Sequence, residues 1–188
     1  MILDGLGDKG IPALGGHTPL QVARTPNLDQ IAAAGVCGLY HSCLQGQAMP
    51  SEMAHFVMFG YDLAQFPGRG YIEMRAEGFP VHSGDVALLS RTFSVKKEKE
   101  MFILKVEKMN IDKETLAPLH KAIRFYYEKG VEIEFIPTKG IAGLSIMRGP
   151  GLSAEITDSN PIYENRPIMK VLPRQDAKNP AAANYTAE

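Results

Sequence analysis

The stretch MPSEMAHFVMFG, residues Met49–Gly60, places a serine directly after a proline, at the start of an apolar segment that ends in glycine. Ser51 is a favourable helix N-cap and Gly60 is a favourable C′ residue, so a helix is predicted between them. A hydroxyl at a helix N-terminus lies at the positive end of the helix dipole, where a phosphate or an alkoxide is stabilised. His55 follows four residues later and is expected on the same helix face as Ser51. By itself the stretch also fits a simple capped helix, so its meaning depends on the segments around it.

Upstream, the sequence MILDGLGD at Met1–Asp8 is typical of a buried strand that breaks into a glycine turn. An aspartate at the carboxyl end of a strand, here Asp4, is how α/β proteins present a carboxylate to a ligand or a metal. A turn-forming Asp-Gly pair is the alternative interpretation. Fewer residues precede Asp4 than the about five or six of an ordinary strand, so the chain is expected to begin inside an element.

Between these two stretches, proline and glycine mark the ends of further elements. Thr25 and Pro26 predict the start of a helix over Asn27–Ala34, which has apolar residues at helical spacing and ends before a glycine. Val36–His41 is then predicted to be a strand. Strand, helix and strand in this order indicate a βαβ unit with a parallel sheet.

The second half of the chain is richer in strand patterns. Strands are predicted at Asp85–Val95 and Met101–Val106, on either side of the charge run Lys96–Glu100, which fits a solvated hairpin tip. A helix is predicted over Leu116–Lys129 with Thr115 as its cap, because apolar residues recur there at helical spacing.

Three more strands complete the prediction, at Val131–Pro137, Leu144–Arg148 and Arg166–Leu172. His120, on the predicted helix, is expected at the surface or at the boundary of the core rather than as a ligand. This strand-rich run with one helix predicts a small α+β region.

Composition limits the classes of protein that remain. The chain has 188 residues, of which 45% are hydrophobic and 22% are charged, so it is expected to be globular with one or two domains. The net charge of −1 gives no basic excess for a nucleic-acid partner. Cys37 and Cys43 lack zinc and CxxC spacing, and they favour free thiols in a reducing, cytoplasmic setting. The sequence shows no signal peptide and no run of 18 apolar residues, so no membrane partner is expected.

Six short motifs of the first half follow one another at the spacings of one known family. They are DGLGD at Asp4–Asp8, GGHTPL at Gly15–Leu20, TPNLD at Thr25–Asp29, PSEMAH at Pro50–His55, GYD at Gly60–Asp62 and GRG at Gly68–Gly70. As an ordered set they resemble the archaeal-type, cofactor-independent (2,3-bisphosphoglycerate-independent) phosphoglycerate mutases. That family belongs to the alkaline phosphatase superfamily.

The resemblance implies an α/β fold: part of an alkaline-phosphatase-like parallel sheet with helices, plus a small inserted α+β lid domain. Residues 1–83 would be the N-terminal part of the catalytic domain. Residues 84–173 would be the inserted lid, or substrate domain. Residues 174–188 would begin the return into a C-terminal half that this sequence does not contain.

The resemblance also implies a reaction: 3-phosphoglycerate and 2-phosphoglycerate interconvert through a phosphoserine intermediate. Ser51 matches the nucleophile, and Asp4 together with Ser51 matches the metal ligands of a site for two divalent cations, Mn²⁺ above all. Metal coordination is a recognised way to activate a serine hydroxyl. His55, Arg69 and Arg148 are the candidate substrate-binding residues, since arginine suits phosphate and carboxylate groups. Arg69 fits a solvated loop arginine equally well.

The chain also departs from the family pattern. Family chains are about twice as long, and most of their metal ligands lie in the C-terminal half, so this chain alone is expected to be inactive and not to hold both metals. The charge run Lys96–Glu100 stands where an arginine-rich lid segment is expected, and Ala142 stands where a basic residue is usual. A lid with fewer arginines holds a doubly charged substrate less well.

Three hypotheses follow. The chain is the N-terminal part of a phosphoglycerate mutase, or a non-catalytic oligomeric binding module built from half of the fold, or part of another metal-dependent phosphatase or phosphotransferase of the superfamily. Half of a sheet exposes an edge and an apolar face, so a homo-oligomer or an association with a C-terminal half is expected in each case. The remaining partner would be a small phosphorylated substrate, phosphoglycerate.

Overall fold

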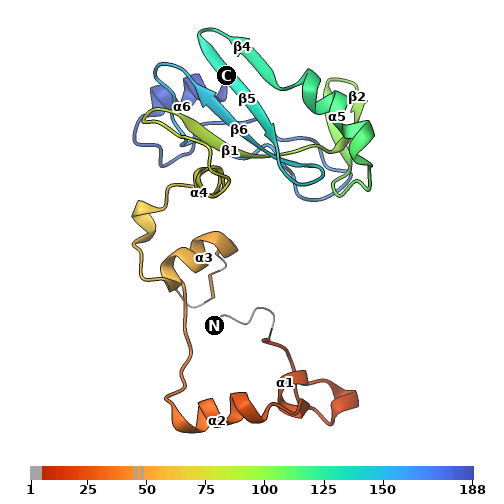
Figure 1. Cartoon of the computed structure of the whole chain (residues 1–188), viewed down its shortest axis with the longest axis vertical. Coiled ribbons are helices and arrows are strands. Elements are labelled where there is room, and N and C mark those ends of the chain that lie inside the picture. The colour runs from red at the N-terminus through yellow and green to blue at the C-terminus, as the bar shows by residue number, and fades with distance from the viewer. Residues whose placement is uncertain (1–5, 45, 48) are drawn as a thin grey trace. The chain divides into compact units, whose positions relative to one another are not determined.

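The computed structural model describes residues 6–44, 46–47 and 49–188 (Figure 1). The chain divides into two compact units, Met1–Met49 and Pro50–Glu188. This division does not test the domain boundary predicted between residues 83 and 84, which stays a prediction. No helix in the described ranges combines the length and the apolar character that crossing a membrane requires.

Among its described residues, the first unit has three short helical elements: η1 at Pro12–Leu14, α1 at Pro19–Val22 and α2 at Pro26–Ala34. Thr18 caps α1 in a reciprocal capping box: its hydroxyl accepts from the Gln21 backbone N–H at 3.2 Å, and Oε1 of Gln21 accepts from the Thr18 N–H at 2.7 Å. The helix predicted over Asn27–Ala34 is confirmed by α2.

The strand predicted at Val36–His41 is not formed, and this prediction is wrong. Val36 and Leu39 are 103% and 92% exposed. A strand persists only when a neighbouring strand satisfies its backbone groups, and no strand pairs with this segment within residues 6–44, 46–47 and 49–188. The strand predicted before Asp4 lies outside the described residues.

The second unit begins with two helices and a short 3₁₀ turn: α3 at Ser51–Met58, η2 at Leu63–Gln65 and α4 at Arg69–Ala76. Its centre is a four-stranded antiparallel sheet in the order β1-β6-β5-β4. The strands are β1 at Val86–Arg91, β4 at Phe125–Glu128, β5 at Val131–Pro137 and β6 at Ala142–Arg148.

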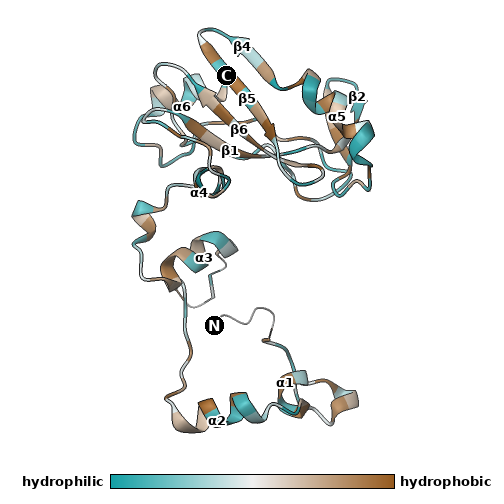
Figure 2. Cartoon of the chain, viewed as in Figure 1, coloured by the Kyte–Doolittle hydropathy of each residue, from teal (hydrophilic) through white to brown (hydrophobic). Residues whose placement is uncertain are grey.

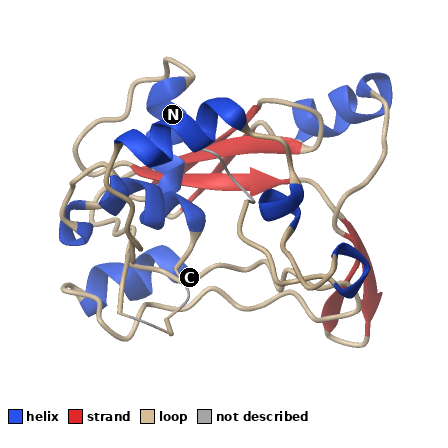
Figure 3. Cartoon of the chain, turned by 90° about the horizontal axis from the view of Figure 1, so that it is seen from below, coloured by secondary structure: helices blue, strands red, loops and turns tan. Residues whose placement is uncertain are grey.

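A separate hairpin pairs β2, Ser94–Glu98, with β3, Met101–Val106 (Figure 3). The α/β class is therefore confirmed. The strand pairs formed within the described ranges are antiparallel, so the parallel pairing expected for residues 1–83 does not occur among them.

Three of the predicted strands are confirmed, and two are revised. β3 and β5 coincide with the predictions, and β6 begins two residues before the predicted Leu144. The predicted strand Asp85–Val95 is instead divided between β1 and β2. Arg166–Leu172 forms only an isolated bridge, between Pro167 and Ile103, because a proline lacks the N–H that a ladder needs.

The helix predicted over Leu116–Lys129 is only partly correct. The structure has α5 at Lys113–Ala122, capped by Asp112 rather than by Thr115. β4 follows it, because aromatic residues favour strands and these pair with β5 across a two-residue turn. Lys129 and Gly130 both have positive φ, 50° and 81°, as a tight hairpin turn requires, so Gly130 ends no helix.

The core of the second unit lies between α4 and one face of the sheet. Met74 of α4 packs with Ile136, Leu144 and Ile146, which alternate along β5 and β6 and point to the same side. Figure 2 shows the apolar colour concentrated along these strands. The opposite face meets α5, through His120 against Phe135, and α6 at Pro180–Ala187.

Candidate functional site

Ser51 is the first helical residue of α3 rather than its N-cap, which corrects the sequence-based assignment. Pro50 occupies the N-cap position with φ −54° and ψ 142°, and its carbonyl accepts the first helical hydrogen bond, from Ala54 N at 3.0 Å. The ψ of Pro50 is extended rather than helical, so Pro50 is the cap and the helix begins at Ser51, one residue earlier than predicted. Within the described part of the chain, no side chain caps the first turn of α3. The Ser51 hydroxyl is thus not used to close its own helix.

The other end of α3 is closed as predicted. Gly60 has φ 87°, and its N–H donates to the Val57 carbonyl at 2.9 Å, while the Tyr61 N–H donates to the Phe56 carbonyl at 3.3 Å. This is the Schellman arrangement, which is completed by an apolar contact across the turn. The rings of Phe56 and Tyr61 provide that contact, stacked with 4.8 Å between their centroids. Phe66 packs edge-on against Phe56 at 5.3 Å, so the end of α3 away from Ser51 is anchored by aromatic packing.

His55 contacts the backbone of Ser51. Its Nδ1 lies 2.7 Å from the Ser51 carbonyl oxygen. A carbonyl oxygen only accepts hydrogen bonds, so Nδ1 carries the proton and Nε2 is left as an acceptor in the neutral ring. The prediction that these two residues share one helix face is consistent with this contact.

Arg69 is the first residue of α4 and is held by its own helix. Its Nε donates to Oε1 of Glu73 at 2.7 Å, one helical turn later. Gly68 precedes it with φ 89°, a conformation that favours glycine. The guanidinium remains about half exposed, so donors are left on it for another acceptor.

Arg148 ends β6 and lies between two carboxylates. Its Nη1 donates to Glu134 at 3.1 Å and to Glu132 at 3.3 Å, from the strand alongside. Partial burial lowers the pKa of Arg148, but its hydrogen bonds to Glu134 and Glu132 and the negative charges of Glu134 and Asp85 outweigh this effect, and the pKa lies above its ordinary value. The positive charge of Arg148 is therefore already compensated within the sheet.

The structure brings together only Ser51 and His55 of the five predicted site residues. Asp4 lies outside the described residues. Arg69 and Arg148 belong to separate ion pairs, on α4 and on β6. Across residues 6–44, 46–47 and 49–188, no three or more His, Cys, Asp or Glu side chains gather in a group that could hold a metal. The described residues by themselves do not fit a two-metal centre.

His120 was expected at the surface or at the boundary of the core, and the structure instead places it among the buried residues. It is 7% exposed, and its Nε2 lies 3.0 Å from the hydroxyl of Thr92. Its ring packs against Phe135 with 5.0 Å between centroids. The hydrogen bond to Thr92 allows a polar ring to be buried at the end of α5.

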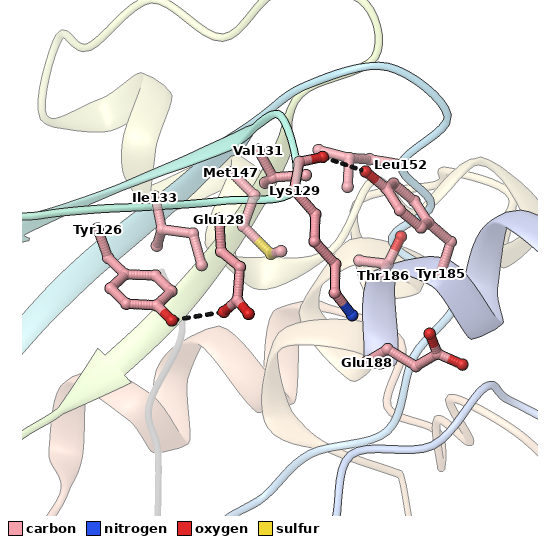
Figure 4. A pocket seen from close by; sticks show the side chains of 10 residues that line it. All are labelled: Tyr126, Glu128, Lys129, Val131, Ile133, Met147, Leu152, Tyr185, Thr186 and Glu188. Carbon is pink, nitrogen blue, oxygen red and sulfur yellow. Dashed lines mark hydrogen bonds between the residues drawn. The ribbon is translucent and has the colours of Figure 1, made fainter.

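A pocket of about 160 Å³, which the sequence did not predict, lies between the sheet and α6 (Figure 4). Val131, Ile133 and Met147 form its apolar floor, and Tyr185 of α6 closes one side through a hydrogen bond from its hydroxyl to the Lys129 carbonyl at 3.0 Å. The pocket was missed because β4 was predicted to be helical. The aromatic run before Lys129-Gly130, followed by the alternating strand β5, is the hairpin signal that would have indicated this wall.

Comparison with known proteins relates the whole chain to one family. The family described as 2,3-bisphosphoglycerate-independent phosphoglycerate mutase matches residues 32–188. The 2,3-bisphosphoglycerate-independent phosphoglycerate mutase 2 of Methanocaldococcus jannaschii is 36% identical over 183 residues, which cover 91% of this chain and 40% of that protein. The corresponding mutase of Methanopyrus kandleri is 36% identical over 190 residues, covering 98% of this chain and 44% of that protein.

Among solved structures, the cofactor-independent phosphoglycerate mutase from Thermoplasma acidophilum matches 99% of this chain and 49% of its own, with 28% identity and a TM-score of 0.53. The chain thus spans less than half of the length of the curated relatives above. The match over residues 32–188 includes α3, both candidate arginines and the whole sheet. The chain belongs to the 2,3-bisphosphoglycerate-independent phosphoglycerate mutase family.

Proposed function

We propose that this chain is the N-terminal part of a phosphoglycerate mutase that interconverts 3-phosphoglycerate and 2-phosphoglycerate, with Ser51 as the nucleophile. The observation that carries the proposal is the position of Ser51 at the first residue of α3, directly after Pro50. A hydroxyl there lies at the positive end of the helix dipole. In the described structure the first turn has no side-chain cap, so its N–H groups are available to phosphoryl oxygens.

In the proposed reaction, the Ser51 hydroxyl loses its proton and its oxygen forms a bond to the phosphorus of 3-phosphoglycerate, while the bond from phosphorus to O3 breaks and O3 takes up a proton. The retained glycerate then presents O2, which loses its proton as it bonds to phosphorus, while the bond from phosphorus to the serine oxygen breaks and the serine regains a proton. The N–H groups of the first turn stabilise the charge on the phosphoryl oxygens. His55 supports this turn through its hydrogen bond to the Ser51 carbonyl.

Arg69 and Arg148 are proposed to contact the phosphate or the carboxylate of the substrate. Arg69 can do so with the guanidinium donors that Glu73 does not use. Arg148 is more strongly engaged, because Glu132 and Glu134 both accept from it. Its contact with substrate therefore requires at least one of these carboxylates to give up its hydrogen bond.

The metal centre belongs in this proposal to the complete protein. Two divalent cations, with Mn²⁺ preferred, would be held by Asp4 and Ser51 together with groups from the part of the relatives that this chain does not span. The isolated chain is accordingly expected to show no mutase turnover.

The test is a chimera in which residues 1–188 replace the matching part of the Methanocaldococcus jannaschii relative, assayed for conversion of 3-phosphoglycerate with Mn²⁺. We expect turnover, with phosphate trapped on Ser51 in a rapidly quenched sample analysed by mass spectrometry. Ser51→Ala should abolish both signals, while the matched change Ser83→Ala should leave them intact.

Two results would contradict the proposal. Turnover that persists in Ser51→Ala would assign another nucleophile. Hydrolysis of a generic phosphate ester without any mutase turnover would indicate a phosphatase of the same superfamily instead.

A further inference from the structure

β4 forms one edge of the four-stranded sheet (Figure 1). Its aromatic residues Phe125, Tyr126 and Tyr127 are 58%, 56% and 70% exposed. An edge strand offers unpaired backbone groups to other strands, and proteins usually protect such edges with a proline, a bulge or a charge that points inward. The edge segment Arg124–Glu128 reads RFYYE, without a proline, and pairs with β5 without a bulge.

The hydrogen bonding with β5 fixes which backbone groups point outward. Phe135 N donates to the Arg124 carbonyl at 2.8 Å, so the backbone of Arg124 points toward β5. In an antiparallel pair the residues of a strand alternate between those that bond to the neighbour and those that do not. Tyr126 and Glu128 therefore bond to β5 as Arg124 does, while the N–H and C=O groups of Phe125 and Tyr127 point to the free edge.

The same segment is complementary to itself. When two copies of β4 are placed antiparallel around a two-fold axis at Tyr126, Phe125 of one copy lies opposite Tyr127 of the other. These are the two residues with outward backbone groups, so each such pair would form two hydrogen bonds. Arg124 of each copy lies opposite Glu128 of the other, so the two-fold axis gives two such pairs of opposite charges. Aromatic pairs and opposite charges are the cross-strand pairs that stabilise a sheet.

Arg124 and Glu128, at the two ends of this segment, can each form an ion pair with a second copy in addition to their present contacts. Arg124 is 60% exposed, and its ion pair with Glu134 spans 3.7 Å. A guanidinium carries five donors, so the group can face a second carboxylate. Glu128 accepts from the Tyr126 hydroxyl, and its second oxygen can accept from an arginine.

We propose that β4 pairs antiparallel with β4 of a second copy of this chain, joining the two sheets into one continuous sheet across a two-fold axis at Tyr126. The pairing is isologous: each copy contributes the same residues, so the contact closes after two copies. The proposal concerns the surface by which the chain self-associates and does not depend on the proposed reaction.

The first test is sedimentation equilibrium of the 188-residue chain over a wide concentration range, where a dimer is expected. Tyr127→Pro should shift it toward monomer, because it removes an outward N–H without removing a bond to β5. Arg124→Glu and Glu128→Arg should each weaken the dimer by about tenfold or more, and the double exchange should restore it. Lys97→Glu, an exposed charge reversal on β2, is the matched control and should have no effect.

The second test reads the register directly, in a background where Cys37 and Cys43 are replaced by serine. Tyr126→Cys should form an intermolecular disulfide on oxidation, because residues facing each other across the axis in a non-hydrogen-bonded pair are about 4.5 Å apart between Cα atoms. Tyr127→Cys is the control, because its counterpart in the other copy lies on the diagonal, at about 7–8 Å. Circular dichroism and the unfolding midpoint confirm that each variant is folded.

A monomeric wild-type chain would overturn the proposal, as would a dimer that Tyr127→Pro and both charge reversals leave intact. Cross-linking of Tyr127→Cys as rapid as that of Tyr126→Cys would overturn the assigned register.

Discussion

The Nε2 of His120 lies 3.0 Å from the hydroxyl of Thr92, and the imidazole that makes this contact is 7% exposed. The pair joins the last turn of α5 to the residue that follows β1. The Thr92 N–H also donates to the Ile141 carbonyl at 2.8 Å, so the same residue ties the start of β6 into the contact. Thr92 thus links three elements that are distant in sequence through two hydrogen bonds.

We expect His120→Ala to lower the free energy of unfolding by about 2 kcal/mol or more, since it leaves a cavity beside Phe135 and an unpaired hydroxyl. Thr92→Val should lower the free energy of unfolding by about 1 kcal/mol. In the double variant the two losses should not add, because the hydrogen bond is counted in both. Denaturant unfolding measures all three, with Lys121→Ala, an exposed neighbour on α5, as the control. Strictly additive losses would show that the two side chains act independently.

Gly70 brings the backbone of α4 close to β1. A Cβ atom at this position would lie 2.3 Å from the carbonyl oxygen of Ala87, and 2.7 Å from its carbon, so the helix would have to move away from the strand. Gly70→Ala is expected to lower the free energy of unfolding by about 1–3 kcal/mol. Gly38→Ala is the matched control, because a Cβ atom there meets nothing within 4 Å. Equal unfolding midpoints for both variants would mean that α4 does not pack against β1 in this way.

Ser51→Ala is expected to leave stability nearly unchanged, within about 0.5 kcal/mol, because the residue does not cap α3. Asp112 does cap a helix: its carboxylate accepts from Thr115 N at 2.7 Å and from the Thr115 hydroxyl at 2.9 Å. Asp112→Ala should therefore cost about 1 kcal/mol in the same denaturant titration. If Ser51→Ala loses as much stability as Asp112→Ala, Ser51 would after all act as a cap of α3.

Glu155 provides a pH-dependent contact at the start of α6. Its carboxylate accepts from the backbone N–H groups of Lys178 at 3.0 Å and of Asn179 at 3.4 Å. These hydrogen bonds, the one from Lys178 above all, hold the pKa of Glu155 below its ordinary value. Because the pKa of Glu155 is lower in the folded chain than in the unfolded chain, the contact stabilises the fold at and above the unfolded-state pKa. This contribution to stability is lost as the pH falls through the lower, folded-state pKa.

We therefore expect Glu155→Gln to be less stable than the wild type at neutral pH, and the difference to shrink as the pH falls below about 4.5. Unfolding midpoints measured from about pH 7 to about pH 3 follow this convergence. Glu100→Gln, in the β2–β3 turn, serves as the control and should parallel the wild type throughout. A stability difference between Glu155→Gln and the wild type that does not change with pH would show that the carboxylate charge is not its cause.

Several local features could be predicted because they depend on neighbours in the sequence. The helix over Asn27–Ala34 follows from a threonine, a proline and a glycine at its ends, and Gly60 from the need for a left-handed residue after α3. β5 follows from its alternating pattern. The order of the short motifs, from Asp4–Asp8 to Gly68–Gly70, indicated the family, which the match over residues 32–188 then confirmed.

Other features could not be predicted, because partners far away in the sequence decide them. Tyr126 and Tyr127 fit a helix pattern, yet they pair with Ile133 and Glu132 as strand residues. Val36–His41 has the composition of a strand, yet no strand pairs with it in the described ranges.

The sequence by itself thus determined the family, the candidate nucleophile Ser51 and the bounds of α2, β3 and β5, since these reside in local order and spacing. Only the tertiary structure decided that Ser51 is the first helical residue of α3 rather than its cap, and that His120 is buried. It also decided that the positive charge of Arg148 is compensated by Glu132 and Glu134. Burial, charge compensation and strand pairing are properties of contacts between distant residues, and a linear pattern does not specify which of these contacts form.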